Sequence, residues 1–135
     1  MASILKVDTL TGVTTAGSIS VTGEGNSTTT NLQQGLAKAW GDFIQVTPAV
    51  LDSLNTTSIT DTSAGRFTPN LINNMSSANY PISSNSIGNS SSYAVSVSTT
   101  GAKSSSGSAQ QSMHNTSGAL GDLSTCTYVY HGDLA

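Results

Sequence analysis

Apolar and polar residues alternate along several short stretches of this chain, which is the pattern of half-buried β-strands. The clearest alternation lies at residues 18–22, 93–98 and 125–131. Clusters of Gly, Asn, Asp and Ser separate the stretches and are typical of turns. The pattern therefore predicts an all-β fold, in which an extended N-terminal segment is followed by a small antiparallel β-sandwich.

Three regions follow from the same pattern. Residues 1–31 hold a sparse apolar stripe and end in a polar linker, which predicts an extended segment for attachment or oligomerisation. Residues 32–40 have helical apolar spacing interrupted by Gly35, so either one helical turn or a coil that leads into a strand is expected for this connector. Residues 41–135 contain the remaining strand and turn signals and are expected to form the sandwich.

The N-terminal stripe is too thin to fold by itself. Burial of one Val, Leu or Ile side chain gains roughly 1.5–3 kcal/mol, whereas ordering each residue costs roughly 1–2 kcal/mol of backbone entropy. The region is therefore either disordered or completed by partner chains, and the regular spacing favours partner chains. The residues expected to make these contacts are Ile4, Leu5, Val7, Leu10, Ile19 and Val21.

Within 41–135, the segment 61–71 predicts a hairpin whose turn is stabilised by the side chain of Asp61. Pro69 lacks a backbone N–H and predicts an edge position. Residues 100–111 are of low complexity and predict a long polar loop, with His114 in a polar loop as well. Large aromatic residues dominate cores, and the predicted core comprises Trp40, Phe43, Phe67 and Tyr128.

The composition is poor in charge. Only 8% of the residues are charged and 36% are hydrophobic, whereas Ser and Thr make up about a third of the chain. The net charge of −3 is too small for disorder driven by charge repulsion. The four basic residues are scattered and form no patch, so we expect no nucleic-acid binding. No apolar run is long enough for a transmembrane helix, and no signal peptide is recognisable, so we expect synthesis in a cytosol and no membrane insertion.

Several segments resemble tail-fibre-like virion structural proteins of marine tailed bacteriophages. The resemblance rests on the opening ILKVDTL at 4–10, on GLAKAW at 35–40 followed by Phe43, and on DSLN at 52–55 followed by SITD at 58–61. It continues in order through Gly65, Phe67, Leu71, Met75 and Tyr80, and so covers roughly residues 1–10 and 35–82. The resemblance implies a virion protein with a β-sandwich-like domain that forms a homotrimer, and it implies no catalytic activity.

The sequence offers little material for catalysis. His114 and His131 are the only imidazoles, and neither lies at a recognised spacing from an acid or nucleophile. The carboxylates Asp52 and Asp122 are dispersed, and the lone Cys126 alternates with tyrosines, which predicts a buried thiol rather than a reactive one. We therefore expect no enzyme, no cofactor and no metal site.

Two classes of function remain open from the residues and the resemblance. The first is a fibre-type subunit of a phage virion, assembled in the host cytoplasm and bound to other virion proteins, with a capsid decoration or a tail adaptor as variants. The second is a module that binds a host surface glycan or another receptor through a rigid β scaffold. Tyrosine is common at binding surfaces, and the candidate receptor contacts are Tyr80 and Tyr93.

Overall fold

The computed structural model of the chain describes residues 4–13, 19–23, 28–87, 96–99, 103–104, 111–114 and 119–135. The chain divides into two compact units, Met1–Gly35 and Leu36–Ala135, which we call unit 1 and unit 2. The division falls inside the segment 32–40, which the sequence predicted as a connector. That segment contains one helical turn, α1 (Leu32–Gly35), and then enters a strand.

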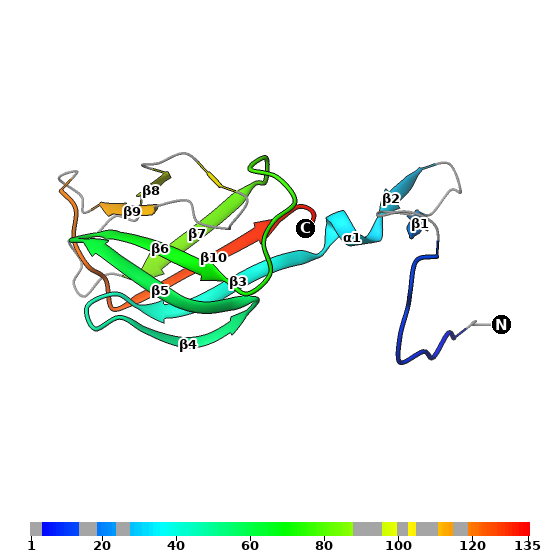
Figure 1. The fold of residues 1–135 in the computed structure, drawn as a ribbon, viewed down its shortest axis with the longest axis horizontal. Helices are drawn as coiled ribbons and strands as arrows, with labels where there is room; N and C mark the ends of the chain where they lie inside the picture. The colour runs from blue at the N-terminus through cyan, green and yellow to red at the C-terminus, as the bar shows by residue number, and fades with distance from the viewer. Residues whose placement is uncertain are drawn as a thin grey trace. The chain divides into compact units, whose positions relative to one another are not determined.

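Unit 1 contains one very short hairpin (Figure 1). Strand β1 (Ser20–Thr22) pairs antiparallel with β2 (Thr29–Asn31) over three residue pairs. The backbone N–H of Gly23 donates to the carbonyl oxygen of Thr28 at 2.9 Å, and the N–H of Gln33 donates to Oδ1 of Asn31 at 2.8 Å. The second bond caps the first turn of α1, because helix N-termini leave backbone donors unpaired.

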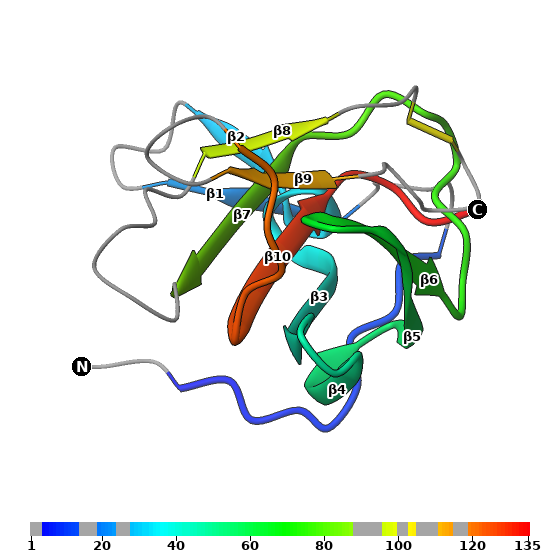
Figure 2. The same ribbon diagram turned by 90° about the vertical axis from the view of Figure 1, so that its left-hand side faces the viewer.

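Unit 2 consists of two four-stranded antiparallel sheets that form a sandwich-like fold (Figures 1 and 2). The first sheet has the order β4-β3-β10-β7, with β4 (Ala49–Leu54), β3 (Ala37–Ile44), β10 (Thr125–His131) and β7 (Ile82–Ile87). The second has the order β5-β6-β9-β8, with β5 (Thr56–Ser63), β6 (Arg66–Leu71), β9 (Gln111–His114) and β8 (Ser96–Thr99). The first and last strands of the unit are thus neighbours at the centre of one sheet.

Alternating burial along β3, β6 and β10 creates the core between the two sheets. The rings of Phe43 on β3 and Phe67 on β6 lie 4.5 Å apart and join the sheets. Tyr128 and Tyr130 extend the aromatic contacts along β10, with their ring centroids 4.9 Å apart. The buried apolar residues are Ala39, Phe43, Phe67, Met75, Tyr80, Leu123, Cys126, Tyr128 and Tyr130. Phe43, Phe67 and Tyr128 are therefore buried where the sequence placed them.

The chain passes from the first sheet to the second at Asn55, which has a positive φ of 56°. Asparagine tolerates this left-handed conformation better than most residues. Its side chain also holds the corner together, since Nδ2 donates to the carbonyl oxygens of Lys38 and Asn73, at 3.1 and 3.0 Å. Oδ1 accepts a hydrogen bond of 2.7 Å from the N–H of Asn73.

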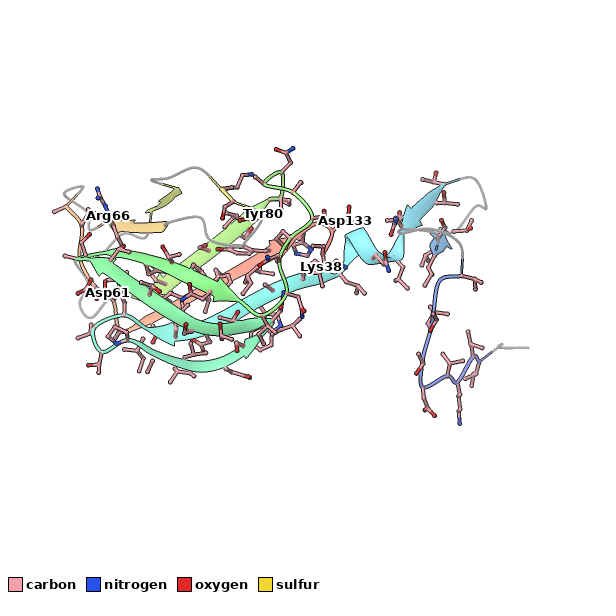
Figure 3. The ribbon with its side chains drawn as sticks, in the orientation of Figure 1. Lys38, Asp61, Arg66, Tyr80 and Asp133 are labelled. Atoms are coloured by element: carbon pink, nitrogen blue, oxygen red, sulfur yellow. The ribbon has the colours of Figure 1, made fainter. Side chains whose placement is uncertain are left out.

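The predicted hairpin at 61–71 is present, but its turn differs from the prediction. Asp61 belongs to β5 and is exposed (Figure 3), whereas the turn lies between Ser63 and Arg66 and contains Gly65 at φ 68°. The N–H of Gly65 donates to Oδ1 of Asp122 at 2.6 Å. The carboxylate that holds this turn therefore comes from a residue 57 positions away, and the role predicted for Asp61 is corrected.

Two other predictions concern the second sheet. In the described residues β9 pairs with β6 only at Arg66 and Phe67, so the buried Pro69 has a neighbouring strand only on the β5 side. Strand β6 lies between β5 and β9, so the predicted edge position is wrong for the strand, although Pro69 itself lies beyond the end of the described β9 pairing. His114 was predicted in a loop, but its backbone belongs to β9, which is a correction.

Candidate functional site

The first candidate surface is the apolar segment of unit 1. Ile4 and Leu5 are 79% and 81% exposed, and Val7, Leu10 and Val21 are exposed as well. Ile19 is half-buried, and its carbonyl oxygen accepts a hydrogen bond from the N–H of Leu32. The apolar residues that the sequence singled out for contact with partners are therefore largely uncovered by their own chain.

The hairpin of unit 1 does not cover them. All three residues of β1 are exposed, and β2 has only Asn31 partly buried. No residue of unit 1 belongs to the buried core of the described chain, which begins at Ala39. The described residues of unit 1 therefore present apolar side chains to solvent, although exposed apolar surface is costly in water.

The second candidate surface is the outer face of the first sheet, and Trp40 belongs to it. The sequence placed Trp40 in the core, but its side chain is only partly buried and lies on the opposite side of β3 from Phe43. Strand geometry explains the correction, because positions 40 and 43 differ by an odd number and side chains alternate between faces. The burial of Phe43 therefore already placed Trp40 on the other face.

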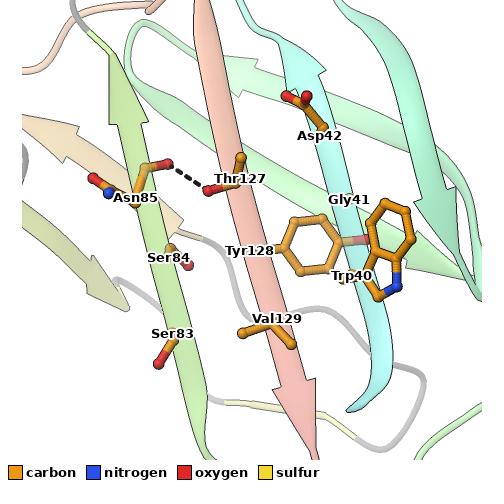
Figure 4. Close-up of a pocket in the computed structure, with 9 residues that line it drawn as sticks. All are labelled: Trp40, Gly41, Asp42, Ser83, Ser84, Asn85, Thr127, Tyr128 and Val129. Atoms are coloured by element: carbon orange, nitrogen blue, oxygen red, sulfur yellow. Dashed lines mark hydrogen bonds between the residues drawn. The ribbon is translucent and has the colours of Figure 1, made fainter.

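Trp40 lines a hollow of about 450 Å³ that spans three strands (Figure 4). In one cross-strand row, Trp40 of β3 lies beside Val129 of β10, which lies beside Ser83 of β7. The adjacent row consists of Asp42, Thr127 and Asn85 on the same three strands. The outward side chains of the hollow are therefore Trp40, Asp42, Ser83, Asn85, Thr127 and Val129.

Gly41 and Tyr128 form the floor of the hollow. A Cβ atom on Gly41 would lie 2.7 Å from Cε1 of Tyr128, so the close approach requires glycine. The hydroxyl of Tyr128 hydrogen-bonds to Oγ1 of Thr56 on the second sheet. Burial raises the pKa of Tyr128 to about 12, while the hydrogen bond from Thr56 acts in the opposite direction. The floor is thus a packed, neutral part of the core.

The rim of the hollow is negatively charged. Oδ1 of Asp42 is buried and has no hydrogen-bond partner in the structure. Asp52 of the edge strand β4 lies directly opposite Asp42 in the register of the sheet. Like charges in such cross-strand positions repel each other. Asp42 therefore retains unused acceptor capacity at a site that disfavours further negative charge.

Tyr80, one of the two tyrosines predicted as receptor contacts, does not lie on a surface. Tyr80 is 2% exposed, and its ring centroid lies 5.2 Å from that of Tyr130. Figure 3 labels the position of Tyr80 in unit 2. Nζ of Lys103 lies over the Tyr80 ring and donates to the Tyr80 carbonyl oxygen at 2.7 Å. Burial raises the pKa of Tyr80. Tyr80 is therefore corrected to a core residue, and Tyr93 lies outside the described residues.

The thiol of Cys126 is the next reactive group to consider. Cys126 is fully buried, and burial, together with the negative charges of Asp122 and Asp42, raises the pKa of its thiol to about 12. A neutral thiol of this kind is a poor nucleophile. In the part of the chain that the structure describes, no group of three or more His, Cys, Asp or Glu residues could hold a metal ion.

Comparison with known proteins gives no relative: no family model, curated protein or solved structure matches the chain. Among the described residues, none of the helical segments has the length and apolar character needed to span a bilayer. The structure shows an all-β fold with antiparallel sheets, and its candidate surfaces are the apolar segment of unit 1 and the hollow at Trp40.

Proposed function

We propose that the chain is a fibre-type structural subunit of a tailed-bacteriophage virion, which forms a homotrimer through unit 1 and attaches there to other virion proteins. The observation that carries the proposal is the contrast between the exposed apolar side chains of unit 1 and the closed core of unit 2. Three copies of unit 1 would supply one another with the apolar contacts that a single copy lacks. The likeness of residues 1–10 and 35–82 to tail-fibre-like proteins supports both the virion assignment and the number three.

The low charge supports the same proposal. A free monomer normally keeps itself soluble through a charged surface, and only 8% of these residues are charged. Subunits of a particle bury part of their surface against sister chains, so they tolerate such a composition. A capsid decoration protein or a tail adaptor would satisfy the same physical requirement, and the location in the particle separates these variants from a fibre.

Molecular mass in solution tests the assembly. Light scattering coupled to size-exclusion chromatography should give three times the chain mass of 13.7 kDa. Leu10→Ser should weaken the oligomer, whereas Leu51→Ser should leave it intact, because both leucines are 57% exposed but Leu51 lies on β4 of unit 2. A monomer at all concentrations, or equal effects of the two substitutions, would contradict assembly through unit 1.

The virion assignment needs a second experiment. Peptide mass spectrometry of purified particles of the encoding phage should detect the chain. Antibody labelling in electron micrographs should place it on a tail appendage, whereas capsid labelling would favour the decoration variant. Absence of the chain from purified particles would reject the proposal.

A further inference from the structure

The hollow at Trp40 has a chemical character that assembly through unit 1 does not require. An aromatic ring and an aliphatic side chain, Trp40 and Val129, lie beside each other in one row across the sheet. The next row presents the carboxylate of Asp42 and the side chains of Thr127 and Asn85. An apolar platform flanked by a few oriented polar groups is the usual composition of a small-molecule site.

The polar row has unused hydrogen-bonding capacity. Oδ1 of Asp42 is buried and without a partner, which is costly for a carboxylate oxygen unless a donor is supplied. The two carboxylate oxygens are equivalent, so rotation about the terminal torsion leaves one of them buried, and the acceptor that a ligand in the hollow can meet is the other oxygen. Thr127 uses its hydroxyl hydrogen toward the carbonyl oxygen of Asn85 at 3.3 Å, and that hydroxyl oxygen can still accept (Figure 4). The polar row therefore suits a ligand that donates hydrogen bonds.

The charge of the hollow excludes one class of ligands. Asp42 lines the hollow and Asp52 lies opposite it on the adjacent strand, so an anionic ligand would be repelled by Asp42 directly and by Asp52 from outside the hollow. The apolar platform requires a ligand with one face of C–H groups that can lie on the indole of Trp40. A pyranose ring combines such a C–H face with hydroxyl donors around its edge.

We infer that the hollow over β3, β10 and β7 is a binding site for a neutral pyranose, which stacks on Trp40 and donates hydroxyl hydrogens to Asp42. A volume of about 450 Å³ lies within the range of ligand sites and leaves room for the ring. Asn85 and Ser83 hydrogen-bond the hydroxyl groups on the β7 side of the ring. The inference rests on unit 2 alone and holds whether or not the chain is a virion subunit.

Trp40 is the only tryptophan of the chain, so its fluorescence reports on this site alone. The full-length protein is titrated with the methyl glycosides of glucose, galactose and N-acetylglucosamine, and with glucuronic acid for comparison. At least one neutral glycoside should change the emission saturably, with a dissociation constant on the order of 1 mM for a single ring. Glucuronic acid should bind at least about tenfold more weakly, because of the two carboxylates.

Substitutions then test which residues contact the sugar. Asp42→Asn should weaken binding of the neutral glycoside by about tenfold or more, because it removes a charge-assisted acceptor of similar size. Asp61→Asn, an exposed carboxylate on β5 of the other sheet, should leave binding unchanged. Calorimetric titration should show loss of binding in Trp40→Ala and partial retention in Trp40→Phe, with circular dichroism as the check of folding.

The inference is overturned if none of the three neutral glycosides gives a saturable change, or if Asp42→Asn and Asp61→Asn behave alike. Equal binding of glucuronic acid would also overturn it. The oligomer mass is recorded for each variant in the same samples. An unchanged mass together with lost sugar binding separates failure at this site from failure of the assembly proposal.

Discussion

Unit 1 and unit 2 both contain apolar residues but differ in how they bury them, and all the aromatic residues of the chain belong to unit 2. In unit 2 each sheet covers the inner face of the other, and Phe43 and Phe67 meet between them. In the described residues of unit 1 the sheet is a hairpin of three residue pairs, and Ile4 and Leu5 remain mostly exposed. The comparison teaches that a segment of this chain buries its apolar side chains where a second sheet and large aromatic rings are both present.

The largest expected effect is the loss of a core ring in unit 2. Phe43→Ala should lower the free energy of unfolding by about 3–5 kcal/mol, because Phe43 is fully buried and joins the two sheets. Ile72→Ala is the matched control, since Ile72 is 62% exposed, and it should change stability by less than about 0.5 kcal/mol. Urea denaturation followed by circular dichroism measures both, and equal values would show that unit 2 lacks a closed core.

The second-largest effect is expected from alkaline pH, which should lower the stability of unit 2. In the native state the raised pKa values keep Cys126 and Tyr128 protonated to about pH 12, whereas their ordinary values are 9.0 and 10.0. Above pH 9 the unfolded chain therefore binds fewer protons, and stability falls as pH rises, by at most about 1.4 kcal/mol per pH unit for each group. Denaturation experiments between pH 8 and 11 measure this decline in the free energy of unfolding. Cys126→Ala should move the pH at which the decline begins from near 9 toward 10. A free energy of unfolding that stays constant up to pH 11 would contradict this account.

A smaller loss of stability is expected from a substitution at the floor of the hollow. Gly41→Ala should cost about 1–3 kcal/mol, because its Cβ would lie 2.7 Å from the Tyr128 ring and the core would have to shift. Gly35→Ala in unit 1 is the control, since nothing lies within 4 Å of its added Cβ. Thermal melting should show a lower midpoint for Gly41→Ala only. A neutral Gly41→Ala would mean that Tyr128 is loosely packed.

The smallest effect on unit 2 should come from the most exposed part of unit 1. Leu5→Ser should change the stability of the sandwich by less than about 0.5 kcal/mol, because Leu5 is 81% exposed and belongs to no buried core. Denaturation at a concentration at which the protein is monomeric measures it. A loss of more than about 1 kcal/mol would show that the two units depend on each other within one chain.

The sequence predicted those parts of the fold that depend on local alternation. Strand β10 and the hairpin of β5 and β6 follow from period-two patterns and turn residues. The buried rings of Phe43, Phe67 and Tyr128 were predicted from residue type, because large aromatic residues dominate cores. The short strand β9 was missed because its sequence, QSMH, has no regular apolar alternation. The prediction that Trp40 lies in the core was wrong, because it relied on residue type and ignored the face of the sheet to which strand geometry assigns position 40.

Other features depend on contacts between distant residues, which a sequence pattern does not encode. Asp122 rather than Asp61 holds the turn at Gly65, over a separation of 57 positions. Tyr80 is buried because Tyr130 and Lys103 meet it in space, whereas tyrosine by itself is equally suited to a surface. The hollow requires the strand order β3-β10-β7, which places residues 40–42, 83–85 and 127–129 side by side.

The central claim is that contacts with sister chains bury the apolar side chains of unit 1, whereas unit 2 buries its core within one chain. Amide hydrogen exchange, read by mass spectrometry at high and at low protein concentration, tests it most directly. We expect residues 4–13 and 19–23 to exchange slowly only in the concentrated, assembled sample, and β3 and β10 to be protected in both samples. Protection of residues 4–13 in a verified monomer, or their full exchange in the assembled protein, would contradict the claim.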